Sequence, residues 1–227
     1  MQPTYLPWLG YFDLVDRSDI FVFLDSVQFD KRSWQQRNRI KEPNGELMLT
    51  VPVLTKGKFD QKICDVVIDR SQKIEKKHFN SIRVNYKRSK YFETYIEELE
   101  NIYNKKIDKL SDLNTTLIRW LSSKLGVNTK FVYSSKLDAS GSKTELLVNI
   151  CKKVGADHYI SPAGSKGYID QNNLFVKSGI KLLYQNYNHP TYNQLHGDFI
   201  PYMSVIDLLF NEGDKSLEVI KSGSSYN

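Results

Sequence analysis

Apolar positions along the chain follow two periods, which together predict alternating strands and helices. Residues 20–24 form a continuous run of aliphatic and aromatic side chains, typical of a central strand buried on both faces. Shorter apolar or alternating runs predict further strands at residues 47–53, 63–68, 129–134, 158–160 and 180–184. Apolar residues spaced by three and four predict helices at residues 9–17, 74–86, 91–103, 107–125, 144–154, 168–178 and 203–211.

The order of these elements predicts the fold class. From residue 127 to residue 184 the pattern is strand, helix, strand, helix, strand, which favours right-handed crossovers and a parallel sheet. Residues 71–125 are helical in pattern and form an insertion lobe in this interpretation. We therefore expect one α/β domain over residues 1–227, with a Rossmann-like, mainly parallel sheet and a helical insertion.

Composition narrows the class of protein. The chain has 227 residues, of which 40% are hydrophobic and 26% charged, as in an ordinary globular domain. It has no apolar run of membrane-spanning length and no signal peptide, so we expect a cytoplasmic protein that is not transmembrane. Cys64 and Cys151 lie far apart without a Cys-x-x-Cys pair, which favours two free thiols.

The charge of the chain indicates an anionic partner. The formal net charge is +6 and the isoelectric point is near 9.1, which suits anionic small molecules such as nucleotide sugars, or an anionic membrane surface. We expect no nucleic-acid partner, because zinc-finger spacing, an RNP sequence and a lysine-rich tail are absent. The four histidines show no metal-ligand spacing, so we expect no metal site.

The first forty-one residues hold the densest candidate chemistry. Pro3 and Pro7 exclude a helix at the start, and the strand at residues 20–24 ends on Asp25. In α/β proteins, sites form where strands end at the carboxyl edge of the sheet, so Asp25 is our candidate general base. The alternative for Asp25 is a structural role, as a cap of the turn that follows.

A basic, amide-rich segment follows Asp25. Lys31 and Arg37 are candidates for an anion site, because cationic side chains bind phosphate and carboxylate groups. Gln28 and Asn38 carry amides suited to sugar hydroxyls. The alternative is a solvated charged loop without a ligand.

A second stretch of interest is the Ser- and Gly-rich segment at residues 161–167. Ser161 and Gly164 would follow a strand and precede a helix, a place where backbone N–H groups bind anions. The alternative is a plain connection between strand and helix. Tyr192 and Gln194 are candidates for lining the same cleft from the C-terminal side.

Familiar nucleotide motifs are absent: neither a P-loop nor Gly-x-Gly-x-x-Gly occurs. Trp8-Leu9-Gly10-Tyr11 stands where nucleotidylyltransferases place His-x-Gly-His, at a turn that leads into a helix. Both histidine positions are aromatic here, so adenylyl transfer of that kind lacks its cations. The similarity is an analogy of fold only.

Motifs spread along the chain match one family pattern. Gln-Pro-x-Tyr-Leu-Pro-Trp-x-Gly-Tyr-Phe at residues 2–12 precedes Asp25-x-Val27-Gln28-Phe29 and segments 33–40 and 49–53. Later matches lie at residues 157–161, 168–170, 192–194 and 204–211. In this order the motifs resemble the WbqC-like family, bacterial proteins associated with O-antigen and other surface-polysaccharide gene clusters.

The resemblance implies a transferase that attaches glycine or another acyl group to an amino sugar. Its partners would be a nucleotide-linked amino sugar and an activated amino-acid or acyl donor, and it indicates no particular cofactor. A second hypothesis stays open, a non-catalytic ligand-binding or assembly protein of the polysaccharide machinery, because no nucleophile is evident. The expected site comprises Gln2, Tyr5, Trp8, Gly10, Tyr11, Asp25, Gln28, Arg37, Asn38, Tyr168 and Asp170.

Two structural expectations accompany this hypothesis. Residues 1–12, 25–41 and 161–170 should converge on one cleft at the carboxyl edge of the sheet. The family pattern also carries a short apolar strand ahead of Gln2, where this chain has Met1. A parallel sheet without that strand would expose unpaired backbone edges.

Overall fold

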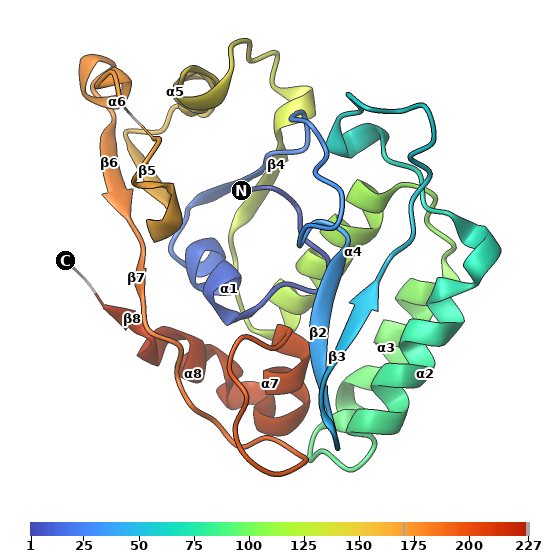
Figure 1. Ribbon diagram of the computed structural model, residues 1–227. Helices are drawn as coiled ribbons and strands as arrows, with labels where there is room; N and C mark the ends of the chain where they lie inside the picture. Colours follow the sequence, from blue (N-terminus) through green and yellow to red (C-terminus); the bar gives the residue numbers. More distant parts are fainter. Residues whose placement is uncertain (170, 226–227) are drawn as a thin grey trace.

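Two parallel strand pairs form where apolar runs predict strands. Strand β1 (Ile20–Phe23) pairs with β4 (Lys130–Tyr133), with Ile20 opposite Lys130. Strand β5 (His158–Ser161) pairs in the same direction with β6 (Lys181–Tyr184) (Figure 1). Parallel pairing of these predicted strands is therefore confirmed.

Two antiparallel pairs complete the strands. Strands β2 (Arg37–Glu42) and β3 (Gly45–Thr50) form a hairpin, and β7 (Asn186–Tyr187) pairs with β8 (Ser224–Ser225). The computed structural model describes residues 1–169 and 171–225. Within them the strands form four two-stranded sheets in a mixed α/β fold, not one continuous sheet.

Helices join and cover these sheets. Figure 1 shows α2 and α3 side by side next to the β2–β3 hairpin, whereas α5 and α6 lie toward the β5–β6 pair. The α-helices are α1 (Leu9–Asp16), α2 (Ile74–Tyr86), α3 (Phe92–Asn104), α4 (Leu110–Lys124), α5 (Lys143–Val154), α6 (Leu174–Lys177), α7 (Val205–Glu212) and α8 (Ser216–Ser222). Short 3-10 helices are η1 (Ile63–Asp65), η2 (Arg70–Gln72), η3 (Ser134–Lys136), η4 (Ala163–Ser165) and η5 (Gly213–Lys215).

Three predicted elements were wrong. Residues 37–42, expected in a polar loop, form β2, because their backbone pairs along its length with β3. Residues 63–68, expected as a strand, contain η1 and make only isolated bridges, at Val67 and Ile68. The helix expected at residues 168–178 is reduced to α6, which begins after Asn173 takes a left-handed φ of 54°. Helix α8 was not predicted.

One large apolar core joins most elements. Phe12 of α1 and Phe23 of β1 belong to the same cluster as Ile82, Leu99 and Leu117 of the helical block. The helices of residues 71–125 therefore pack into the core beside β1. A smaller cluster under β5 and β6 comprises Val148, Cys151, Ile169, Phe175 and Ile180. No helix in the described part of the chain is long and apolar enough to cross a membrane.

A buried polar chain crosses the large core. The hydroxyl of Tyr5 lies 2.7 Å from Nδ1 of His78 and 2.5 Å from the hydroxyl of Tyr103. Burial lowers the pKa of His78 from 6.5 to about 4, opposed by a hydrogen bond with the backbone of Thr50. The imidazole is therefore neutral in the folded protein above about pH 4.

The pKa of His78 predicts acid sensitivity. Between pH 6.5 and about 4 the unfolded chain binds a proton that the folded chain does not, so this contribution to stability is complete above pH 6.5 and is lost as the pH falls. We expect His78→Gln to flatten the fall in free energy of unfolding between pH 7 and pH 5, measured by urea titration. Asn101→Gln, on the exposed face of α3, changes no titratable group and is the control, which should keep the parent slope. A His78→Gln slope equal to that of the parent would contradict this assignment.

Candidate functional site

Residues 2–7 have no helix or strand of their own, and the side chain of Asn38 fixes their path. Its Nδ2 donates to the carbonyls of Tyr5 (3.2 Å) and Leu6 (2.8 Å), and its Oδ1 accepts from the backbone of Arg39. Leu6 has a φ of 43°, a left-handed conformation that costs a residue with a side chain about 1–2 kcal/mol. The hydrogen bond to its carbonyl offsets part of that cost.

A second buried amide, Asn114 in α4, supports the same segment. Its Nδ2 donates to the carbonyls of Pro3 (3.1 Å) and Gln35 (2.7 Å). The Gln35 side chain in turn donates to Oε1 of Gln2 at 2.9 Å. Oδ1 of Asn114 is buried and has no partner within the described residues. Sequence reasoning missed Asn114, although an asparagine beside Leu113 and Leu117 on an apolar helix face was a signal.

We call the motif at residues 2–12 the first motif. Its residues Trp8, Gly10 and Tyr11 contact other residues closely. The Trp8 indole stacks on His189 with ring centroids 6.0 Å apart and contacts Tyr202 at 5.4 Å. Gly10 leaves room for that indole, because a Cβ there would collide with it. The buried Tyr11 donates its hydroxyl to the carbonyl of Gln2 at 3.3 Å.

Asp25 joins the end of β1 to η3, which follows β4. Its Oδ1 accepts from the Ser134 hydroxyl (3.0 Å) and the Ser135 backbone (2.8 Å), and its Oδ2 accepts from the Ser135 hydroxyl (2.7 Å). The side chain is only 3% exposed. These bonds fix the orientation of the Asp25 side chain. They agree with the capping alternative and use three of about four acceptor positions of a carboxylate.

The basic segment divides into paired and unpaired side chains. Arg39 pairs with Glu46 at 2.8 Å, and the Lys41 ammonium donates to the carbonyl of Gly197. Gln28 donates to the carbonyl of Phe59 at 3.2 Å, and Lys31 lies over the Phe59 ring. Nε of Arg37 is buried and has no hydrogen-bond partner within the described residues, and the same holds for Nε of Arg39.

Residues 161–169 are held by contacts of their own. The hydroxyls of Ser161 and Ser165 lie 2.6 Å apart, and Tyr168 is 63% exposed. A Cβ at Gly164 would meet open space. No hydrogen bond, ion pair or ring contact within the described residues joins this segment to residues 2–41. Asp170, which belongs to the expected site, lies outside the described residues.

The carboxylate of Asp207 gathers the C-terminal candidates. It accepts from the hydroxyls of Tyr86 and Tyr192 and from Nε2 of Gln194, each at 2.8 Å. Burial raises the pKa of Asp207. Tyr192 and Gln194 therefore fix the loop before α7 against α2. Among the described residues, no group of three or more His, Cys, Asp or Glu side chains could hold a metal ion.

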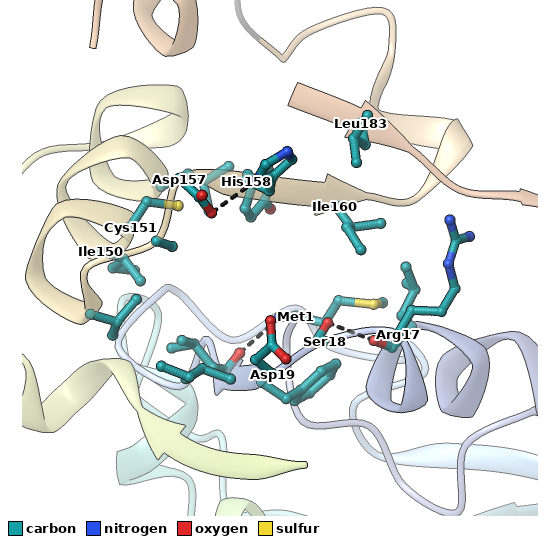
Figure 2. A pocket seen from close by; sticks show the side chains of 18 of the residues that line it. Met1, Arg17, Ser18, Asp19, Ile150, Cys151, Asp157, His158, Ile160 and Leu183 are labelled. Atoms are coloured by element: carbon teal, nitrogen blue, oxygen red, sulfur yellow. Dashed lines mark hydrogen bonds and ion pairs between the residues drawn. The ribbon is translucent and has the colours of Figure 1, made fainter. Parts of the chain in front are cut away.

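A cavity of about 460 Å³ lies between β1 and β5. Figure 2 shows Met1 and Asp19 on one wall and Cys151, His158 and Ile160 on the facing wall. The Met1 amino group donates to the carbonyl of Val22 (2.8 Å), and the Leu24 backbone donates to the carbonyl of Met1 (2.8 Å). Through these two bonds Met1 pairs with the end of β1 in the parallel direction.

Further along the cavity, the edge groups of Ile20, His158 and Ile160 have no strand partner within the described residues. Lys130 donates to the carbonyl of Asp19, so the odd-numbered residues of β1 face β4 and the groups of Ile20 and Val22 face the other way. Lys181 likewise donates to the carbonyl of Asp157, which leaves His158 and Ile160 on the side away from β6. We call this cavity the inter-strand groove.

Comparison with known proteins gives one family. The family model described as the WbqC-like protein family matches residues 2–219. An uncharacterized protein of Mycobacterium tuberculosis (strain ATCC 25618 / H37Rv) is 35% identical over 223 residues, covering 97% of this chain and 96% of that protein. No solved structure matches the chain significantly.

The hydrogen bonds of Asn38 predict a stability cost for its removal. Asn38→Ala leaves the buried carbonyls of Tyr5 and Leu6 without their donor, so we expect the free energy of unfolding to fall by about 1–3 kcal/mol. Urea titration measures this. Asn101→Ala, on the exposed face of α3, is the matched control and should change stability by less than about 0.5 kcal/mol. An equal loss of stability in Asn38→Ala and Asn101→Ala would contradict the role of Asn38 in supporting the first motif.

The inter-strand groove predicts that added residues can stabilise the fold. An apolar Val-Ile-Val segment joined to Met1 would pair with β1 and β5 and would replace a buried ammonium whose pKa burial lowers from 8.0 to about 5. We expect the melting temperature to rise by about 2–4 °C for each kcal/mol gained. A Gly-Asp-Gly segment of the same length is the control. If both segments act alike, the groove does not accept a strand.

Proposed function

Because the chain belongs to the WbqC-like protein family, we propose that it is a transferase of surface-polysaccharide (O-antigen) biosynthesis. In this proposal it attaches glycine or another acyl group to a nucleotide-linked amino sugar in the cytoplasm. The proposal includes a Rossmann-like arrangement of its parallel strand pairs. The carboxyl ends of β1 and β4 then supply the reacting residues.

The observation that carries the proposal is the presence of unsatisfied buried polar atoms in the segments that contain Asn38 and Asn114, the two residues that support residues 2–7. Nε of Arg37 and Oδ1 of Asn114 have no partner within the described residues. Unsatisfied buried groups are uncommon and call for a ligand or water. A sugar hydroxyl or amine can donate to Asn114, and a phosphate oxygen can accept from Arg37. Gln2 and Gln35 lie next to Asn114 and extend this polar surface.

The transfer needs a group that accepts a proton from the sugar amine. The amine nitrogen forms a bond to the acyl carbon, the donor's leaving group departs, and the ammonium proton passes to a base. Asp25 is the proposed base, since its carboxylate retains one acceptor position beside the three used by Ser134 and Ser135. In this proposal, the hydrogen bonds from Ser134 and Ser135 orient the Asp25 carboxylate so that its remaining acceptor position faces the substrate amine.

A second candidate function is a ligand-binding or assembly protein without turnover. It is favoured by the same hydrogen bonds, because they give Asp25 a complete structural role at the end of β1. The two functions differ in one observable. Only the transferase changes the mass of the amino sugar when nucleotide-linked sugar and activated glycine are incubated with the protein.

Asp25→Asn separates the two candidates. The amide keeps the shape and can satisfy Ser134 and Ser135 but cannot take a proton, so turnover should fall by about 10²–10⁴-fold with little change in ligand affinity. Mass spectrometry of the product and calorimetric binding measure the two effects. Ser135→Ala is the matched control, which removes one hydrogen bond while keeping the carboxylate. Full activity in Asp25→Asn would exclude Asp25 as the base, and an inactive parent would favour the binding function.

A further inference from the structure

A second cavity, of about 590 Å³, lies between the N-terminal half of α2 and the C-terminal end of α3. Its volume falls within the range of about 300–1,000 Å³ that is usual for small-molecule sites. None of the residues expected in the transferase site lines it. We call it the helical-block cavity.

The rim of the helical-block cavity carries an excess of positive charge. Arg70 is neutralised by Glu75 at 2.6 Å and Asp108 at 2.8 Å. Four further cations line the cavity, and none of them makes an ion pair within the described residues: Lys73, Lys76, Arg83 and Lys106. Glu100 is the one other acidic residue of the lining. A concave surface lined by one sign of charge concentrates counter-ions.

Two further features of the cavity favour a ligand. Arg70 has a buried Nη2 without a hydrogen-bond partner in the described part of the chain. The floor is aromatic, since Phe79 and Tyr103 line the cavity while being 8% and 2% exposed. Guanidinium groups bind phosphate oxygens in bidentate fashion, and aromatic faces accept an apolar ring.

We propose that the helical-block cavity binds a small organic phosphate, with the phosphate at Lys76 and Arg83 and the ring or apolar part on Phe79 and Tyr103. The inference does not depend on the transferase function. Tyr103 connects this floor to the first motif, because its hydroxyl lies 2.5 Å from that of Tyr5. A ligand on Tyr103 is therefore in contact with the buried chain that ends at His78.

Phenyl phosphate is the probe, titrated into the full chain by calorimetry at low ionic strength. We expect saturable binding tighter than about 1 mM, and tighter than binding of inorganic phosphate because the ring meets the aromatic floor. Equal affinities for phenyl phosphate and inorganic phosphate would contradict the placement of the ring on Phe79 and Tyr103. The absence of saturable binding would overturn the site itself.

Paired variants with equal changes in charge locate the binding. The double variant Lys76→Gln with Arg83→Gln should weaken binding by about tenfold or more, the usual effect of losing hydrogen bonds to charged groups. Lys87→Gln with Arg88→Gln removes two exposed cations just beyond α2 that do not line the cavity, and should leave the affinity within about twofold. Both sets replace exposed side chains, and circular dichroism checks that they fold. An equal loss of affinity in both double variants would show that the net charge of the protein attracts the phosphate, and it would overturn the proposal.

Discussion

Two buried side-chain amides hold the irregular first segment in place, and the remaining site geometry depends on them. Asn38 reaches this segment from β2 and Asn114 reaches it from α4, so a strand and a helix far apart in sequence donate to different carbonyls of one short segment. Backbone carbonyls without secondary structure need such partners when they are buried. The backbone carbonyls of Pro3, Tyr5 and Leu6 thus act as the hydrogen-bond acceptors that fix residues 2–7.

This support explains how one short segment contacts several parts of the molecule. With the backbone fixed, Tyr5 enters the core toward His78, and Trp8 covers Gly10 and meets the loop around His189. Asp25 and Asp207 perform comparable joining roles elsewhere, each accepting three hydrogen bonds from other segments. The buried atoms of Arg37, Arg39 and Asn114 that lack partners within the described residues differ from these carboxylates, because such groups call for a ligand or water.

The sequence predicted elements whose own residues determine them. The spacing of Ile74, His78 and Ile82 gave the bounds of α2, and the apolar run at residues 20–24 gave β1. Strand β2 could not be recognised, because Arg37, Asn38 and Arg39 have no apolar alternation and pair only through the partner β3. For the site, residue types were informative but directions were not: Asn38 was expected to face a ligand, and its amide faces the backbone of Tyr5 and Leu6.

The inter-strand groove also bears on how this protein behaves at high concentration. A bare strand edge on a surface is a template for pairing with another molecule, and proteins commonly aggregate through such edges. Here the groups of β1 and β5 that lack partners within the described residues face one another across the inter-strand groove, with Leu14 of α1 and Ile150 of α5 also in its lining. Because the two edges face each other, another chain must enter the groove to pair with either of them.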